Sequence, residues 1–348
     1  MKSSSGWRRR GRRTVRELAR RPENDRRELF RATAQAMHVH EAIIEKDFWV
    51  CWALDYLFQD SPWKDRMAFK GGPSLSKVYR AIERFSEDID LILDWRLLGY
   101  SEDEPWQERS TTKQDAFGKQ ANQRAVEFLA QEFAPVLTRE LKRRAEADIA
   151  VAVQGQDVLI QYPRAFALEA INPQIRLEIG PLAAWVPNEQ KAIRPYAADQ
   201  FPKLFTNPGT TVRTIAVERT FWEKATILHQ EAHRGPDRAL PPRYSRHYYD
   251  VYRLSLLPLR NDALAKIELL QEVVRFKMRF YRSPWAKYEE AKPGSFRLSP
   301  PTHHVPELQR DYAAMRTMLF GAVPTFGEII SGLAALEKSI NELKADGD

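Results

Sequence analysis

Residues 69–93 read FKGGPSLSKVYRAIERFSEDIDLIL, and they decide how the fold is interpreted. The apolar run at residues 67–70 predicts a short β-strand that ends at Gly71 and Gly72. Two glycines let the backbone turn sharply and approach a ligand closely. The start of a helix after that turn would offer unpaired N–H groups and the positive end of its dipole, which together suit a phosphate. Apolar residues at helical spacing predict such a helix, namely Leu75, Val78, Tyr79, Ile82 and Phe85.

A second strand is predicted at residues 88–93, where acidic and apolar side chains alternate. Asp88 and Asp90 lie two residues apart, so both side chains project from the same face of the strand. Two neighbouring carboxylates repel each other unless a cation lies between them, and such hard oxygen ligands suit Mg²⁺. A phosphate site beside a magnesium site is what phosphoryl or nucleotidyl transfer requires. An Asp-x-Asp pair alone is usually a solvated strand edge, so this interpretation depends on the two motifs occurring together in this order.

Composition excludes several other classes of protein. The chain has 348 residues, of which 43% are hydrophobic and 29% are charged, as in an ordinary globular protein. Its one cysteine, Cys51, excludes a disulfide framework or a multi-cysteine metal site within the chain. No G-x-x-x-x-G-K-[ST] pattern occurs, which disfavours a P-loop ATPase. The sequence contains neither a long apolar stretch nor a secretory signal, so we expect a cytoplasmic protein without a membrane span.

The formal net charge of +7 is concentrated at the N-terminus. Residues 1–31 hold twelve Lys or Arg against four acids, whereas the rest of the chain is nearly neutral. Phosphates attract clustered arginines without any reading of base sequence. This segment is therefore either a tether for nucleic acid or a solvated tail.

The remaining patterns predict a mixed α/β core followed by a helical half. Helices are expected at 28–58 and 117–147, strands at 150–153, 158–162 and 175–179, a linker at 195–208, and mostly helix from about Glu218. The predicted regions are a flexible basic arm at 1–27, an α/β domain at 28–205 and a helical domain at 206–348.

The run at 69–93 resembles the AbiEii/AbiGii toxin family of nucleotidyltransferases, which is part of the polymerase-β-like nucleotidyltransferase superfamily. Further similar runs are TFWEKATILH at 220–229, RYSRHYYDVYRL at 243–254 and DYAAMRTMLFGAVPTFGEII at 311–330. The resemblance covers about residues 28–345. It implies an α+β fold, with a mixed sheet and flanking helices as the nucleotidyltransferase core and a mainly helical C-terminal half.

The resemblance also implies roles for residues around the glycine turn. Gly71, Gly72 and Ser74 would form the nucleotide-binding cradle, although Pro73 stands where the family usually has Thr and removes a hydroxyl and an N–H group. Lys77 lies one turn later and would either reach the nucleotide or extend to solvent over apolar surface. Asp88 and Asp90 would bind Mg²⁺ and take part in catalysis.

A third acid is expected on a later strand. Glu178 lies between apolar residues of the strand predicted at 175–179, and by resemblance it completes the metal site. Arg176 shares its face and is the alternative partner for Glu178, which would then be an ordinary exposed strand glutamate.

Downstream residues complete the implied site. Lys224 would neutralise the triphosphate, or else pair with a nearby glutamate on the surface. Asp250 would orient Lys224 or act as a base on the attacking hydroxyl. Arg243 and Arg246 would grip phosphates or the acceptor, or form structural salt bridges.

The expected function is that of a Mg²⁺-dependent nucleotidyltransferase toxin in a toxin–antitoxin or abortive-infection system. The substrate would be an NTP, the acceptor the 3′ end of tRNA, and the partner an antitoxin from a neighbouring gene. Two alternatives stay open, namely transfer to a protein hydroxyl and a non-catalytic module that binds nucleotide or a partner. His229 and His233 share a helix face, but no third zinc ligand is evident.

Overall fold

The computed structural model describes residues 13–86, 88–169 and 171–343. These residues form two compact units. The first contains the described residues up to 78 together with 86–214, and the second contains 79–85 together with the described residues from 215 on. The sequence predicts a boundary at residue 205, whereas the packing changes at Ile215, and a seven-residue segment from the first half joins the second unit.

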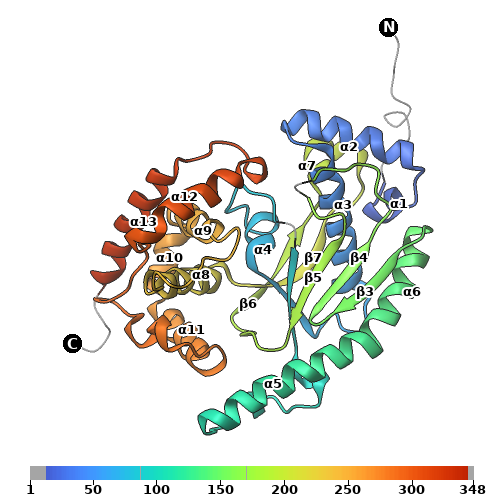
Figure 1. The fold of residues 1–348 in the computed structure, drawn as a ribbon. Coiled ribbons are helices and arrows are strands. Elements are labelled where there is room, and N and C mark those ends of the chain that lie inside the picture. Colours follow the sequence, from blue (N-terminus) through green and yellow to red (C-terminus); the bar gives the residue numbers. More distant parts are fainter. Residues whose placement is uncertain (1–12, 87, 170, 344–348) are drawn as a thin grey trace. The chain divides into compact units, whose positions relative to one another are not determined.

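The first unit is built on a mixed seven-stranded sheet with the order β3-β4-β5-β2-β1-β7-β6 (Figure 1). Its strands are β1 Met67–Lys70, β2 Asp88–Leu93, β3 Ala150–Gln154, β4 Asp157–Gln161, β5 Ile175–Gly180, β6 Asn188–Ile193 and β7 Thr210–Ile215. The central strand β2 runs antiparallel to β1 and parallel to β5. The predicted α+β class, a mixed sheet with flanking helices, is thereby confirmed.

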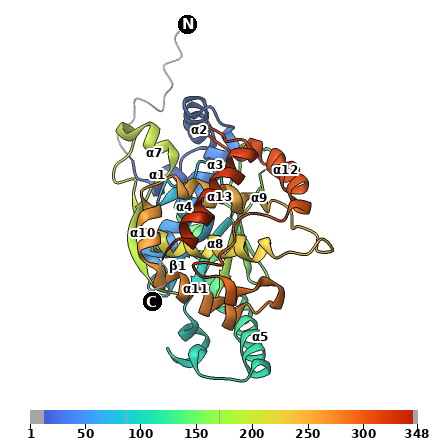
Figure 2. The same ribbon diagram turned by 90° about the vertical axis from the view of Figure 1, so that its left-hand side faces the viewer.

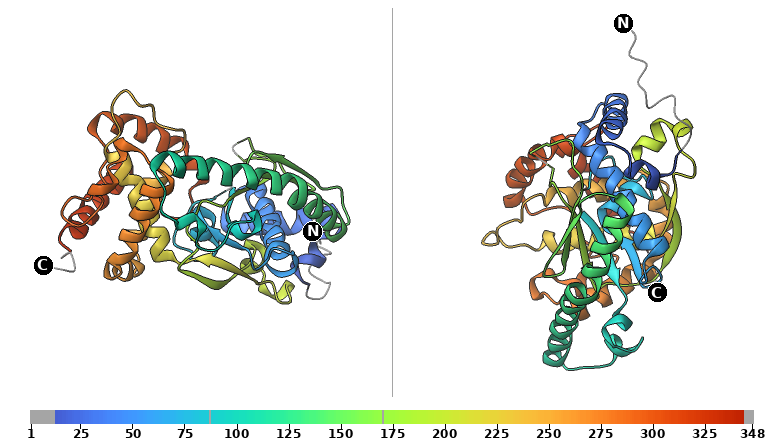
Figure 3. Two further views of the ribbon diagram at one scale, coloured as in Figure 1. Left: turned by 90° about the horizontal axis from the view of Figure 1, so that it is seen from below. Right: turned by 90° about the vertical axis from the view of Figure 1, so that its right-hand side faces the viewer.

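Helices flank this sheet (Figure 1). They are α1 Val15–Ala19, α2 Glu23–Met37, α3 Glu41–Asp55, α4 Gly71–Lys77, α5 Thr111–Phe128, α6 Ala134–Ala145 and α7 Tyr196–Gln200. In α3, residues 42–54 are all buried, as expected for a helix enclosed on every side. One π-helical turn, Leu129–Phe133, joins α5 to α6 in a long, nearly continuous helix (Figure 3).

The expected flexible arm at residues 1–27 is folded where the structure describes it. Thr14 and Glu17 form a capping box at the start of α1, and Val15 and Ala19 are buried. Arg16 pairs with Asp55 and Asp60, so part of the basic segment is neutralised internally. Residues 13–27 therefore pack against the first unit, while residues 1–12 lie outside the described residues and their role as an arm stays a prediction.

The helix predicted from the glycine turn to Phe85 is shorter than its apolar spacing indicates. It ends at Lys77, and Arg80 adopts a positive φ of 50°. Residues 79–85 instead extend into the second unit, where Phe85 N–H donates to Met318 O and Phe320 N–H donates to Glu83 O. Backbone pairing in that unit replaces the helical hydrogen bonds.

The second unit is helical (Figure 2). Its helices are α8 Val217–Ala232, α9 Ser245–Ser255, α10 Leu259–Ala265, α11 Ile267–Phe280, α12 Val305–Ala314 and α13 Phe326–Asn341. Here α8 packs against α9, α10 and α11, while α13 packs along α9. In the described residues of both units, no helix is long and apolar enough to cross a membrane.

Candidate active site

The glycine turn lies against the acidic strand. Gly71 has a φ of 77°, a conformation that L side chains rarely adopt. A Cβ atom at Gly71 would come within 1.8 Å of Oδ2 of Asp90, so the absence of a side chain makes room for this carboxylate. The register explains the approach, because Lys70 in β1 faces Asp90 in β2. Both halves of the sequence motif therefore meet at one place in the sheet.

Three carboxylates gather on this face. In the parallel pair of β2 and β5, Asp88 faces Arg176 and Asp90 faces Glu178, and the side chains of paired residues point to the same side. Burial, together with the charges of Asp90 and Asp88, raises the pKa of Glu178 to about 7. Arg176 Nη2 lies 3.4 Å from Oε1 of Glu178. Glu178 therefore neighbours both the aspartates with which it would bind a metal and the arginine that is its alternative partner.

Asp88, Asp90 and Glu178 offer carboxylate oxygens, which suit a hard divalent cation. Their like charges raise the pKa of Glu178, and a cation between them would relieve this repulsion. As the side chains stand, no three His, Cys, Asp or Glu residues in the described parts of the chain form a group that holds a metal ion. The Nη2 atom of Arg176 binds Oδ2 of Asp157 at 2.7 Å, so Arg176 bridges two acids on this face. Magnesium binding by Asp88, Asp90 and Glu178 stays a prediction.

The structure places Ser74 and Lys77 inside the protein. The Ser74 hydroxyl donates to the Gly71 carbonyl oxygen at 2.9 Å and thus stabilises the turn. Lys77 is buried, forms an ion pair with Asp47 and lies 3.7 Å from the ring centroid of Tyr196. Burial lowers the pKa of Lys77, but the Asp47 carboxylate outweighs this effect and raises it above the ordinary range. These contacts favour an indirect role for both residues, and their binding of nucleotide stays a prediction.

In the second unit, Lys224 and Asp250 come together on α8 and α9. Lys224 Nζ lies 2.7 Å from Oδ2 of Asp250, whose side chain is fully buried. Arg84 donates to the same carboxylate, from Nε to Oδ1 at 2.6 Å and from Nη2 to Oδ2 at 2.8 Å. Burial alone would raise the pKa of Asp250, yet the two cations hold it well below its usual range. Such a carboxylate is a poor base, so the geometry favours the alternative in which Asp250 orients Lys224.

This cluster carries more positive than negative charge. Burial lowers the pKa of Lys224, and the charges of Arg84 and Arg246 lower it further, against the opposing effect of Asp250. Burial also keeps the pKa of His247 well below its ordinary value, and the buried Nδ1 of His247 has no hydrogen-bond partner among the described residues. An excess of buried cations beside an unpartnered nitrogen suits an anionic ligand.

Arg243 is exposed and has a φ of 60°, and its backbone N–H donates to Oδ1 of Asp311 at 2.6 Å. That the side chains of Arg243 and Arg246 bind phosphate or the acceptor stays a prediction. Arg84 is the residue that sequence reasoning missed. It lies just before the acidic strand, but no spacing marks it as a partner of Asp250.

The alternative of a zinc site at His229 and His233 is disfavoured by their hydrogen bonds. His229 Nε2 lies 3.0 Å from Lys287 O, and its Nδ1 accepts from the Arg297 N–H at 3.1 Å. His233 Nδ1 lies 2.8 Å from His229 O. Both ring nitrogens of His229 are therefore used within the protein.

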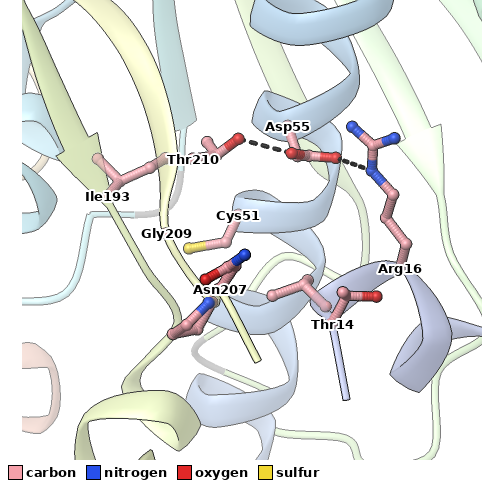
Figure 4. Close-up of a pocket in the computed structure, with 10 residues that line it drawn as sticks. Thr14, Arg16, Cys51, Asp55, Ile193, Asn207, Gly209 and Thr210 are labelled. Carbon is pink, nitrogen blue, oxygen red and sulfur yellow. Dashed lines mark hydrogen bonds and ion pairs between the residues drawn. The ribbon is translucent and has the colours of Figure 1, made fainter. Parts of the chain in front are cut away.

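A pocket of about 260 Å³ in the first unit lies between α1, α3 and the segment before β7 (Figure 4). Asp55 forms part of its wall, where it accepts from Arg16 and Thr210. Cys51 also lines it, and burial raises the pKa of this thiol, so it is not a reactive thiolate. None of the sequence-predicted site residues lines this pocket.

Comparison with known proteins identifies the family. The family model described as nucleotidyl transferase AbiEii toxin, type IV toxin–antitoxin system, matches residues 52–337. MenT4, a nucleotidyltransferase toxin from Mycobacterium tuberculosis H37Rv, has a similar fold, with a TM-score of 0.53, 15% identity and coverage of 92% of this chain and 91% of that chain. A protein from H. pylori, assigned as a nucleotidyltransferase, has a TM-score of 0.41, 13% identity and coverage of 87% and 96%, which is too distant to carry an argument.

No curated protein matches the chain in sequence. The family match nevertheless spans most of the chain, including the glycine turn, the acidic strand and the helices that carry Lys224 and Asp250. The chain therefore belongs to the AbiEii nucleotidyltransferase toxin family of type IV toxin–antitoxin systems and is a nucleotidyltransferase.

Proposed function

We propose that this toxin transfers a nucleoside monophosphate from an NTP to the 3′-terminal hydroxyl of tRNA, with Mg²⁺ bound by Asp88, Asp90 and Glu178. The observation that carries the proposal is the approach of Asp90 to Gly71, with Glu178 as its register neighbour. This arrangement puts a carboxylate group directly beside the glycine turn. Bound Mg²⁺ would supply charge neutralisation at the reacting phosphate.

In the proposed reaction, the acceptor oxygen forms a bond to the α-phosphorus. The bond from that phosphorus to the bridging oxygen breaks, pyrophosphate leaves with the electron pair, and the hydroxyl proton passes to solvent. In the first unit, the turn at Gly71 and Gly72 would accommodate phosphate. In the second unit, the cationic cluster of Lys224, Arg84 and Arg246 suits negative charge such as that of a nucleotide.

An RNA acceptor is supported by charge. In the sequence, residues 1–12 contain Lys2 and four arginines and no acid. Such a segment attracts phosphates without reading bases. Modification of the tRNA 3′ end would prevent aminoacylation and so stop growth, as a toxin does, and an antitoxin is the partner that the family implies.

The direct experiment incubates the purified full-length protein with each α-labelled NTP, Mg²⁺ and total tRNA. The Asp88→Ala/Asp90→Ala double variant should lose transfer. Asp148→Ala removes a surface carboxylate that is 94% exposed, and this matched control should retain transfer. Labelled tRNA in the wild-type and control samples, with none in the double variant, would support the proposal.

Other outcomes point to the alternatives. Label in a protein band with none in RNA would replace the tRNA acceptor with a protein hydroxyl. Mg²⁺-dependent NTP binding without release of pyrophosphate would indicate a non-catalytic module. Full transfer by the folded double variant would refute the role of the two aspartates.

A further inference from the structure

We propose that Arg84 is a positioning residue: acting through Asp250, it sets the direction in which Lys224 presents its ammonium group. This inference rests on the proposed function, in which Lys224 meets the negative charge of the nucleotide. It adds a residue that lies within the run at 69–93, four positions before Asp88, but to which the sequence analysis assigns no role.

The hydrogen bonds show how Arg84 acts. A carboxylate turns readily about its last side-chain bond, because that torsion has a broad minimum. Two parallel bonds from the planar guanidinium of Arg84 hold both oxygens of Asp250 and so hold its plane. Lys224 has a long flexible stem, and its ammonium contacts Oδ2, one of the oxygens that Arg84 holds. The position of Oδ2 therefore decides where the ammonium lies.

Arg84 is itself anchored by backbone pairing. It faces Leu319 in an antiparallel bridge within the second unit. On one side Phe85 N–H donates to Met318 O at 2.8 Å, and on the other Phe320 N–H donates to Glu83 O at 2.8 Å. Because both neighbours are paired, the Arg84 side chain extends from a backbone with little freedom to move.

Charge gives Arg84 a second effect on Lys224. With Lys224 as its sole cation, Asp250 would form a neutral buried pair. Because Arg84 shares the carboxylate, the group of three residues carries a net positive charge. The side chains of Arg84, Asp250 and Lys224 are only 6%, 0% and 9% exposed. Lys224 then keeps an attraction for phosphate that a neutral pair would lack.

The test is a double-mutant cycle on the full-length protein, with kcat/KM for transfer of labelled nucleotide to tRNA as the readout. Its members are the wild type, Arg84→Met, Lys224→Met and the double variant. Residues that act through one another show non-additive losses. We expect Arg84→Met to lower kcat/KM at least about tenfold, and the double variant to match Lys224→Met within about twofold. Losses that multiply would overturn the proposal.

The chain offers a matched control on the same segment. Arg253 pairs with Glu83 at 2.8 Å, outside the Asp250 cluster, so Arg253→Met tests the loss of an ion pair that merely anchors the segment. It should stay within about twofold of wild type. If Arg84→Met does not fold, as judged by circular dichroism, Arg84→Lys takes its place in the cycle, since it keeps the charge but cannot bond both oxygens.

A second readout does not depend on activity. The ¹⁵N signal of the Lys224 ammonium, assigned by its loss in Lys224→Met, reports the environment of this group directly. We expect Arg84→Met, or the folded Arg84→Lys, to shift or broaden it, and Arg253→Met to leave it unchanged. An unchanged signal in the Arg84 variant would overturn the inference. If the wild type transfers no label, the proposed function fails, and this signal alone decides the role of Arg84.

Discussion

Replacing Gly71 with Ala tests the contact that carries the proposed function. The new Cβ would lie 1.8 Å from Oδ2 of Asp90, whereas real Cβ atoms essentially never come closer than 3.0 Å, so the carboxylate must move by more than about 1 Å. A displacement of that size at a reacting centre costs about 100-fold in rate, or about 2.7 kcal/mol. The positive φ of 77° adds a folding cost of about 1–2 kcal/mol for any L residue.

A matched variant separates these two effects. Gly155, in the β3–β4 turn, also has a positive φ, of 61°, but a Cβ there meets no atom of the described residues within 4 Å. Gly155→Ala should therefore lose only the stability that the positive φ costs, about 1–2 kcal/mol, while keeping its transfer rate. Thermal unfolding measures the first quantity, and kcat/KM for transfer to tRNA with saturating Mg²⁺ measures the second.

The reasoning would be refuted by equal transfer rates in the two folded variants. Such a result would mean that the Asp90 carboxylate tolerates displacement and is not held for catalysis by the turn. If kcat/KM of Gly71→Ala fell only because KM for the NTP rose, with kcat unchanged, the effect would lie on nucleotide binding instead.

Three further changes have defined outcomes. Glu45 accepts from the Ala165 and Phe166 N–H groups, and burial raises its pKa from 4.5 to about 7, so the folded protein holds this proton more tightly than the unfolded chain. Stability should fall by up to about 3 kcal/mol as pH rises through that window, and Glu45→Gln should flatten the plot of Tm against pH. Burial lowers the pKa of His229 from 6.5 to about 4, so stability should fall as pH drops through that window, and a zinc chelator should leave Tm unchanged. Lys77→Met leaves the buried Asp47 without its cation and should cost about 3–5 kcal/mol, seen as a lower urea midpoint.

The strands and turns that local pattern describes were predicted well. The run at 67–70, the glycine turn and the strand at 88–93 appear where they are expected, because alternation and glycine positions act over a few residues. The strand at 210–215 was missed. It lies beside β1 in parallel, a pairing between segments that are distant in sequence.

The helix predicted through Phe85 shows where local pattern fails. Its apolar residues have helical spacing, but the backbones of Glu83 and Phe85 form hydrogen bonds with residues 318–320, and the Arg84 side chain binds Asp250. Tertiary pairing outweighs local propensity when a segment can satisfy its backbone groups and bury a charge elsewhere.

Local sequence patterns are enough to place two glycines before a helix and two aspartates on one face of a strand, because turn and strand periodicities extend over only a few residues. Which side chains meet depends on how distant elements pack. Glu178 lies beside Asp90 through strand order, Lys77 meets Asp47 through helix packing, and Arg84 reaches Asp250 across 166 residues of sequence. No local period encodes such neighbours, since they arise when distant elements pack to bury apolar surface and their charged groups pair within it.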